Sequence, residues 1–514
     1  MNGVDKPKSR PIKTVAVMMM VTVGAKLLGV IRASIQASHY GIGMEANAFS
    51  QAYNIPLTFF DMLLSAAILG CFIPVYNSFT QDDKGKSEAD NFASLFLNII
   101  TLVTGLLAIL GILFAQPIIN IMGAELDPET RILAVKLLRI MFPAIIFTGS
   151  TYILVGVLQS KGRYILPASI SAVSNAVIIG YLLFFDYGLD DNRIYGLAVA
   201  YLLSWIAQLL ILVIPLIRGG FNYRLLFDFK NPLLINTLKS VPPIMVGSWL
   251  APFTLLTGLH FSAYVGNITV FDNSITVYNL ITGILVHSLC NYIFPILSKL
   301  SVHGDENEFN KIVNTGLTAS FAIMIPFMCM VFLLNGEGIA VLYMDNAYTP
   351  DAAYLTANTL RLMTIAMPAF ALIEILNRVF YSKRLNKIPM IATLCGIAVN
   401  IITAVVLTGI DGVGVGAVSI AVAASQITAA GVLVIFLFKK IKGVINKKLF
   451  INAVKILISG IVSFLAMRVV YYFMGNNPYE SGNLKNIIVI LIIFAVGAIT
   501  YIGGLFITRL KISE

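Results

Sequence analysis

The chain has 514 residues, of which 58% are hydrophobic and only 12% are charged. Soluble globular proteins have about 25% charged residues, so this composition excludes an ordinary soluble protein and indicates a polytopic membrane protein. The formal net charge of +10 is then better explained by basic loops at one membrane face than by a nucleic-acid partner, and no nucleic-acid partner is expected.

Apolar segments follow one another along the whole chain. A helix that crosses a bilayer needs about 20 mostly apolar residues, and fourteen segments meet that standard. They are 12–38, 46–77, 92–115, 132–159, 165–185, 195–217, 241–264, 273–298, 312–334, 353–381, 388–409, 414–438, 451–474 and 486–508. The sequence therefore predicts an all-α polytopic membrane protein with fourteen transmembrane helices.

Lysine and arginine residues are distributed unevenly between the connections of these segments. If the N-terminus lies inside, most of the 35 basic residues fall in inside segments, and the outside segments hold only Arg131, Arg193 and Lys485. This is the positive-inside pattern. It predicts a multi-pass plasma-membrane protein with both termini in the cytoplasm, and an inside basic loop, 439–450, that contacts anionic membrane lipids.

Short motifs recur at an offset of 222 residues. LRIM at 138–141 is followed by LRLM at 360–363, and Pro167 is followed by Pro389. Each copy has six predicted crossings, an even number, so the two copies have the same orientation in the membrane. The motifs therefore predict two six-helix lobes related by a parallel pseudo-repeat.

This duplication predicts three domains: an N-lobe at 1–218, a C-lobe at 219–438 and a C-terminal helix pair at 439–514. Transporters built from two parallel halves bind substrate between them and rock the halves about it. No ATPase module, nucleophile motif or metal-ligand spacing accompanies the repeat, and the four cysteines fall inside apolar segments. We expect a transporter and not an enzyme, with no cofactor and no metal site.

Three charged residues lie inside the first two predicted helices. Lys26 and Asp61 are near the middle of their helices, and Arg32 is six residues beyond Lys26. A charge at the bilayer centre costs at least about 2.5–3.5 kcal/mol, so intramembrane charges indicate function by default. The functional interpretation is a cationic cavity for an anionic ligand, tuned by Asp61. The alternative is a structural ion pair between Lys26 and Asp61.

The second half carries fewer charges of this kind. Glu374 precedes Arg378 by four residues, a spacing that favours a structural ion pair within one helix. His287 is a candidate protonation switch, although a single helix histidine is more often just hydrogen-bonded. Asp61, His287 and Glu374 are the candidate ion-coupling residues.

Several of these segments are similar to those of one known family. LLGVIR at 27–32, YGIGMEANAF at 40–49, FIPVY at 72–76 and GVLQSKGRYILPA at 156–168 resemble the bacterial lipid II flippases, the MurJ/MviN family of the multidrug/oligosaccharidyl-lipid/polysaccharide exporter superfamily. The resemblance implies a two-lobed fold in the bacterial inner membrane. It also implies a cationic cavity for the diphosphate of an undecaprenyl-linked cell-wall precursor, and a groove for the lipid tail along the last two helices.

The resemblance carries over residue by residue, with departures. Arg32 and Lys26 take the places of two first-helix arginines. Asn47 stands where the family usually has aspartate, and Asp61 stands where an arginine is typical. Another arginine and a glutamate are replaced by Thr276 and Asn279. The expected substrate-binding residues are Lys26, Arg32, Asp61, Asn47, Thr276 and Asn279, in a cavity that is less cationic than usual.

The expected function is translocation of an undecaprenyl-diphosphate-linked peptidoglycan precursor, lipid II, from the inner to the outer leaflet by alternating access. The expected partners are this polyprenyl-diphosphate-linked glycan, anionic membrane lipids and cell-wall synthesis enzymes. Three alternatives stay open. The chain can be a flippase for another polyprenyl-linked glycan, a cation-coupled multidrug exporter, or a membrane scaffold that recruits wall-synthesis enzymes through its basic loops.

Overall fold

The computed structural model describes residues 10–79, 83–186, 192–247, 249–265, 267–303, 306–410, 412–441, 443–444 and 447–510. Regular structure in these ranges is helical, without strands. The chain divides into two compact units. Unit 1 consists of Met1–Gln36, Ala48–Ile121 and Asp127–Met245, and unit 2 of Ala37–Asn47, Met122–Leu126 and Val246–Glu514.

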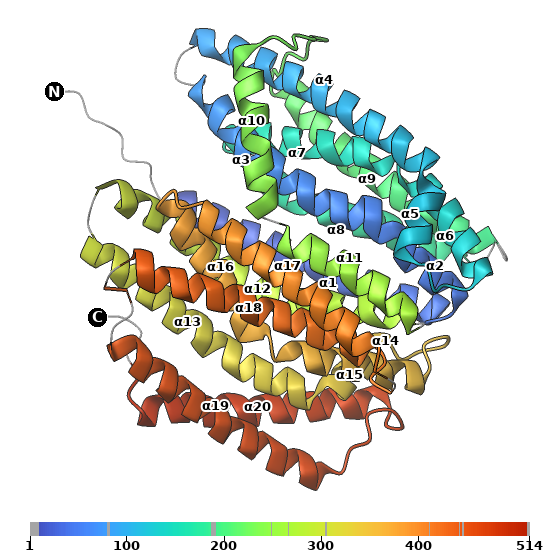
Figure 1. The fold of residues 1–514 in the computed structure, drawn as a ribbon, viewed down its shortest axis with the longest axis vertical. Coiled ribbons are helices and arrows are strands. Elements are labelled where there is room, and N and C mark those ends of the chain that lie inside the picture. Colours follow the sequence, from blue (N-terminus) through green and yellow to red (C-terminus); the bar gives the residue numbers. More distant parts are fainter. Residues whose placement is uncertain are drawn as a thin grey trace. The chain divides into compact units, whose positions relative to one another are not determined.

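Unit 1 holds most of the first eleven helical elements (Figure 1). They are α1 (Arg10–Tyr40), α2 (Met44–Tyr53), the π-helical segment η1 (Asn54–Phe59), α3 (Phe60–Ser78), α4 (Asp83–Leu113), α5 (Ala115–Met122), α6 (Pro128–Met141), α7 (Ala144–Ser160), α8 (Ile165–Phe184), α9 (Arg193–Arg218) and α10 (Pro232–Gly247). The last turn of α1 and the first residues of α2 belong to unit 2.

Unit 2 holds the remaining ten helices. They are α11 (Leu250–Tyr264), α12 (Ile268–His303), α13 (Glu306–Leu333), α14 (Asn335–Tyr343), α15 (Pro350–Thr364), α16 (Met367–Ser382), α17 (Lys387–Thr408), α18 (Gly416–Lys440), α19 (Lys447–Met474) and α20 (Asn483–Ile507). The basic loop expected at 439–450 falls in part on residues 442, 445 and 446, which lie outside the described residues.

The all-α membrane fold is confirmed. Ten helices in the described ranges are long and apolar enough to cross a membrane, or up to twelve if the bent pairs α6–α7 and α15–α16 each form one span. All fourteen predicted segments coincide with helix, but four of them, 46–77, 132–159, 241–264 and 353–381, are divided into shorter helices. The exact number of fourteen spans therefore stays a prediction.

Prolines account for the interruptions in these spans. Pro56 lies in η1, where the backbone widens into a π-helical segment, because proline lacks the N–H that a regular helix needs. Pro143 lies at the break between α6 and α7, which are bent by 40°, and Pro368 opens α16 after a bend of 49° from α15. Each bend thus has a local covalent cause.

Helices α6 and α15 have the same type of N-terminal cap, but the capping side chains differ. Asp127 caps α6 by accepting a hydrogen bond from the Thr130 amide at 2.9 Å, with Pro128 as the first helical residue. Thr349, 222 residues later, caps α15 by accepting from the Ala352 amide at 3.3 Å, again before a proline. Both caps satisfy an amide that the helix itself leaves without a partner.

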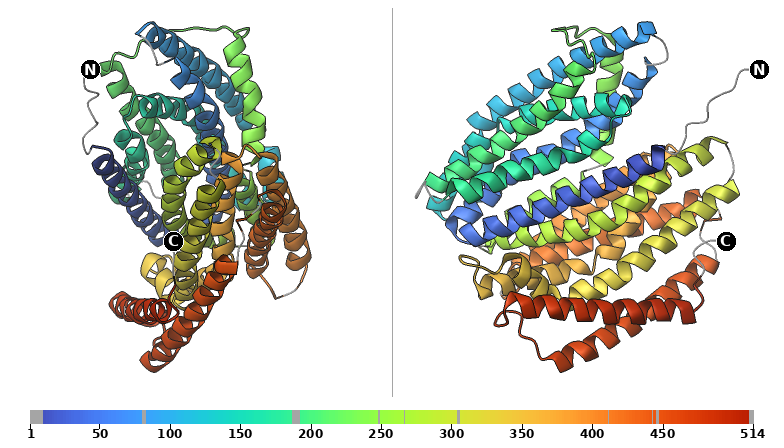
Figure 2. Two further views of the ribbon diagram at one scale, coloured as in Figure 1. Left: turned by 90° about the vertical axis from the view of Figure 1, so that its left-hand side faces the viewer. Right: turned by 180° about the vertical axis from the view of Figure 1, so that it is seen from behind.

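Packing repeats as well. In the first half α7 packs on α3 and α4, and α8 on α9; in the second half α16 packs on α12 and α13, and α17 on α18. Helix order, bends and neighbours therefore recur at the offset that the sequence motifs indicated. The C-terminal pair α19 and α20 packs on α13 and α14 and has no counterpart in the first half (Figure 2).

Candidate functional site

Arg32 lies on α1 and is held by an aromatic cluster. Its guanidinium carbon is 5.4 Å from the centre of the Tyr201 ring on α9, within the range of a cation–π contact. The Tyr201 ring also contacts those of Phe49 and Tyr53, at 5.1 and 5.6 Å. The Tyr201 hydroxyl donates to Gln36 Oε1 at 2.8 Å. These contacts restrict the orientation of the guanidinium.

Lys26 is half-buried and lies six residues before Arg32 on α1. The carbonyl of the preceding residue, Ala25, accepts a hydrogen bond from Asn175 Nδ2 of α8 at 3.1 Å, which fixes this part of α1 in unit 1. Lys26 forms no ion pair with any residue that the structure describes. Its ammonium therefore stays a cation without an acidic partner within the described chain.

Asp61 does not pair with Lys26 in the described chain, so the alternative of a structural ion pair between these two residues is wrong. The Asp61 carboxylate accepts a hydrogen bond from the hydroxyl of Tyr152 at 2.7 Å, across the packed pair α3 and α7. The π-helical segment η1 immediately precedes α3. Each extra residue in a helix rotates the following side chains by about 100°, so a regular-helix projection from α2 gives the wrong face for Asp61.

Asn47 has a structural contact in unit 2. Its Oδ1 accepts hydrogen bonds from the backbone amide and the hydroxyl of Thr269, at 3.0 and 2.9 Å, and its Nδ2 donates to the Ile42 carbonyl at 3.2 Å. Thr269 is in the first turn of α12, where amides lack helical partners. Asn47 therefore caps α12, and Asn47 and Thr269 are equivalent positions of the repeat, 222 residues apart.

Thr276 and Asn279 lie one turn apart on α12, in unit 2. Thr276 is half-buried and Asn279 is exposed, on a stretch of helix that is apolar enough to span a membrane. An exposed amide is unfavourable against lipid tails, which indicates that Asn279 faces a polar medium.

Glu374 and Arg378 form the ion pair that their spacing predicted, with Arg378 Nη1 2.9 Å from Glu374 Oε2. His260 Nδ1 is 3.1 Å from the carbonyl oxygen of Met122. The side chain of His287, the third candidate for ion coupling, lies outside the described residues.

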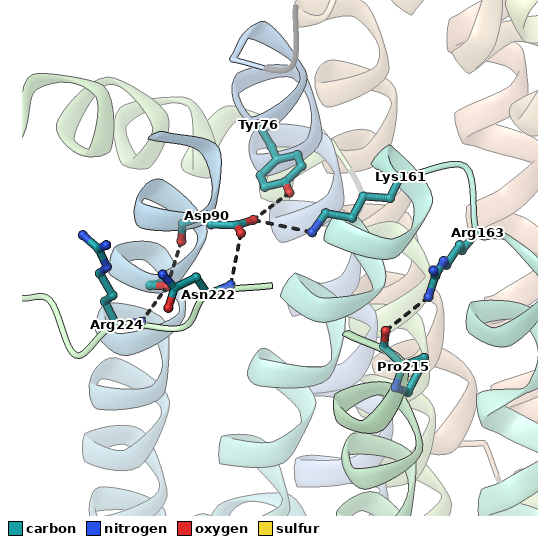
Figure 3. Close-up of polar contacts among 8 residues, drawn as sticks. Tyr76, Asp90, Lys161, Arg163, Pro215, Asn222 and Arg224 are labelled. Atoms are coloured by element: carbon teal, nitrogen blue, oxygen red, sulfur yellow. Dashed lines mark hydrogen bonds and ion pairs between the residues drawn. The ribbon is translucent and has the colours of Figure 1, made fainter. Parts of the chain in front are cut away.

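Asp90 is the centre of a polar cluster in unit 1 that the sequence analysis missed (Figure 3). Its side chain is buried, and Oδ1 accepts a hydrogen bond from the Tyr76 hydroxyl at 3.4 Å and lies 3.5 Å from Lys161 Nζ. The buried carboxylate thus has both a hydrogen-bond donor and a cation, as burial of a charge requires.

The connector between α9 and α10 is attached to one face of α4. Asp90 Oδ2 accepts from the Asn222 amide at 3.1 Å, and Ser94 Oγ accepts from the Arg224 amide at 3.2 Å (Figure 3). One turn further, Asn98 Nδ2 donates to the Arg224 carbonyl at 3.1 Å. The spacing of four residues places these three side chains on one helix face, and this spacing was the signal in the sequence.

Comparison with known proteins places this geometry in a family. A family profile described as "Lipid II flippase MurJ" matches residues 36–494. The chain belongs to the lipid II flippase MurJ family. Among its MurJ relatives, the probable lipid II flippase MurJ of Buchnera aphidicola subsp. Acyrthosiphon pisum is 28% identical over 395 residues, 76% of each chain. That of Bdellovibrio bacteriovorus is 22% identical over 513 residues, 98% of this chain and 95% of the relative.

Solved structures agree with the MurJ fold. A lipid II flippase MurJ in an inward closed conformation superposes with a TM-score of 0.79, at 23% identity, over 96% of this chain and 99% of that one. An inward-facing MATE multidrug transporter of the MOP superfamily superposes with a TM-score of 0.70, at 14% identity, over 83% and 98% of the two chains. At these identities the superpositions establish the fold alone.

Proposed function

We propose that this MurJ family member is a flippase that moves lipid II, an undecaprenyl-diphosphate-linked peptidoglycan precursor, from the cytoplasmic to the outer leaflet. The observation that carries the proposal is Lys26, a half-buried cation in a spanning helix without an acidic partner in the described chain. Leaving such a charge inside the membrane costs at least about 2.5–3.5 kcal/mol. An anionic substrate group offsets that cost.

A diphosphate suits this arrangement chemically. Ammonium and guanidinium groups form charge-assisted hydrogen bonds to phosphate oxygens, which are shorter and stronger than neutral ones. In the proposal, Lys26 attracts the diphosphate as a mobile point charge. Arg32, oriented by Tyr201, presents a planar fork with two parallel donors.

Asp61 has a different part in the proposal. Its hydrogen bond with Tyr152 keeps this carboxylate from neutralising Lys26, so the cation stays available for substrate. Asp61 sits where relatives were expected to carry a positive charge, and we propose that it contacts the uncharged sugar hydroxyls. Thr276 and the exposed Asn279 of α12 are also proposed as substrate-binding residues.

Alternating access requires some contacts to break. Asn47 and Thr269, and also Ser38 Oγ and Asp345 Oδ2 at 2.9 Å, tie residues 37–47 to the rest of unit 2. We propose that these hydrogen bonds open during transport. Asp61, His287 and Glu374 remain candidates for ion coupling, and coupling at Glu374 requires its ion pair with Arg378 to open.

Further parts of the proposal concern the surroundings. The chain is proposed to lie in the bacterial inner membrane with both termini in the cytoplasm. The domains are proposed at 1–218, 219–438 and 439–514. Anionic lipids around the basic loop 439–450, and cell-wall synthesis enzymes, are the proposed partners besides the polyprenyl-linked glycan.

Complementation of a bacterium depleted of its own lipid II flippase tests the proposal. We expect the chain to restore growth and, in reconstituted vesicles, to move labelled lipid II between leaflets. Restored growth without lipid II movement, or movement only of another polyprenyl-linked glycan, would contradict it. Resistance to cationic drugs in place of complementation supports the multidrug exporter, and loss of recruitment of wall enzymes after changes in the basic loops supports the scaffold.

A further inference from the structure

Glu337 is a buried carboxylate far from the proposed substrate residues in the chain. It lies on the short helix α14 and only 1% of its surface is exposed. Helix α14 packs against α20 of the C-terminal pair. Removing a carboxylate from water costs several kcal/mol unless charge or hydrogen bonds compensate for it, so the partners of Glu337 must account for its burial.

Only one of the two oxygens of the Glu337 carboxylate accepts hydrogen bonds. Glu337 Oε1 accepts hydrogen bonds from the Tyr471 hydroxyl of α19 at 2.7 Å and from Asn476 Nδ2, in the α19–α20 connection, at 3.1 Å. Glu337 Oε2 is buried without a hydrogen bond, and so is Asn476 Oδ1. Two oxygen acceptors without donors thus belong to two groups that already touch each other.

The orientation of the Asn476 amide is set by its neighbours. Nδ2 donates both to Glu337 Oε1 and to Asn486 Oδ1, at 3.1 and 2.9 Å. Turning the amide over would place its oxygen against these two acceptors and lose both hydrogen bonds. The buried oxygen Oδ1 therefore has to find another partner, and every polar group of the cluster described so far is an acceptor or is already used as a donor.

No cation of the described chain forms an ion pair with the carboxylate. The cation whose charge acts on the partner Tyr471, after that of Glu337 itself, is Arg468, which is exposed on α19. Burial, and then the negative charge of Glu337, raise the pKa of Tyr479 in the α19–α20 connection to about 12. Where the connection packs on α14, the carboxylate therefore has two hydrogen-bond donors and no paired cation within the described chain.

We propose that Glu337 and Asn476 bind a hard monovalent cation such as Na⁺, with Glu337 Oε2 and Asn476 Oδ1 as protein ligands. Hard cations prefer carboxylate and carbonyl oxygens. The single carboxylate balances one positive charge, whereas Ca²⁺ sites use six to eight oxygens and usually several carboxylates. No group of three or more His, Cys, Asp or Glu suited to a metal occurs in the described chain, which argues against a transition metal.

The cation links α14 of the second repeat to the connection of the C-terminal helix pair. Its occupancy stabilises the attachment of α19 and α20, independently of whether lipid II is the substrate. The site thus adds a dependence of the folded state on Na⁺ to the proposed transport function.

Thermal unfolding of the full-length protein in lipid nanodiscs tests the site. NaCl replaces choline chloride at constant ionic strength. We expect the unfolding temperature to rise with the logarithm of Na⁺ concentration, because a ligand at 100 times its Kd raises the folded-to-unfolded ratio roughly 100-fold. Glu337→Gln, which keeps the shape and can donate to Asn476 Oδ1, is expected to lose this dependence.

Glu306→Gln is the matched control. Glu306 is also a carboxylate of unit 2, but it is exposed and paired with Lys383, so this variant is expected to keep the full Na⁺ response. An equal response in Glu337→Gln and wild type would overturn the proposal, as would an unfolding temperature in wild type that does not change with Na⁺. A carboxylic-acid C=O infrared band at neutral pH that disappears in Glu337→Gln would show a bound proton in place of Na⁺ and would equally overturn it.

Discussion

Tyr152 of α7 and Glu374 of α16 occupy equivalent positions of the repeat, 222 residues apart, in helices with equivalent neighbours. In the first half the tyrosine hydroxyl donates to Asp61 of the neighbouring helix. In the second half the glutamate pairs with Arg378 on its own helix. The residue equivalent to Arg378 is Gly156, where no ion pair can form.

The difference shows that the repeat preserves backbone features and not charges. Proline bends, helix caps and packing partners recur in both halves. Glu374 and Arg378 of the second half neutralise each other, whereas Lys26 of the first half has no acidic partner in the described chain. A charge that is paired within its own helix is not available to a substrate, so the anion-binding chemistry is expected in the first half.

The largest expected effect is on transport. Its absence would contradict the assignment of anion binding to the first half. Lys26→Gln and Arg32→Gln are each expected to reduce the rate of lipid II translocation at least about tenfold, because a hydrogen bond to a charged group contributes about 1.5–3 kcal/mol. Translocation in reconstituted vesicles is the measurement. Lys136→Gln removes the same charge from an exposed position of α6 and should leave the rate close to wild type. Wild-type rates in both test variants would remove the basis for placing the anion site in unit 1.

A stability effect is expected in the second half. Arg378→Ala leaves Glu374 without its cation and is expected to lower the free energy of unfolding by about 2–3 kcal/mol, somewhat less than for a fully buried pair. The double variant Glu374→Gln/Arg378→Gln should recover most of this loss. Denaturant unfolding in nanodiscs measures both. If the double variant is as unstable as Arg378→Ala, the loss of stability does not come from leaving the Glu374 carboxylate without a cation.

Gly156 is the first-half equivalent of Arg378, and the packing around it leaves no room for a side chain. A Cβ on Gly156 would lie 2.8 Å from Cδ1 of the fully buried Phe72, so Gly156→Ala is expected to destabilise the protein by about 1–3 kcal/mol. The control is Gly180→Ala in α8, where no heavy atom lies within 4 Å. That replacement should be neutral or stabilising by up to about 1 kcal/mol, as measured by the same unfolding assay.

The two helix caps give the smallest effect and differ in pH dependence. Asp127→Ala and Thr349→Ala are each expected to cost about 1 kcal/mol at neutral pH. Hydrogen bonds from the side chain and the amide of Thr130 lower the pKa of Asp127. Its contribution is therefore present above the ordinary pKa of about 4 and is lost as the pH falls through the lowered value. Unfolding at several pH values should show this loss for Asp127 and none for Thr349.

The fold was predictable because each requirement is local. Twenty apolar residues in succession must form a helix in lipid, since the backbone has no other hydrogen-bond partners there. Pro143 and Pro368 interrupt two such runs and produce a bend in each. The short helices α5 and α14 were missed because they are below spanning length and adjoin longer helices.

The candidate site was less predictable because its contacts join distant elements. The ion pair of Glu374 and Arg378 follows from spacing within one helix. The partner of Asp61 depends on which face of α3 meets α7, and the role of Asn47 depends on the position of α12, 222 residues away. Neither is set by local sequence, so a pairing of Lys26 with Asp61 stayed open as an alternative.

The way in which the connector between α9 and α10 is held affects how easily proteases can cleave it. Proteases cleave extended segments that can be drawn into their active sites. The connector is extended around Asn222 and Arg224, but its backbone amides and carbonyls are already bound by Asp90, Ser94 and Asn98 of α4. Both ends of the connector lie in unit 1. Its residues around Arg224 are exposed, but cleavage there requires the hydrogen bonds to α4 to open first, which disfavours it.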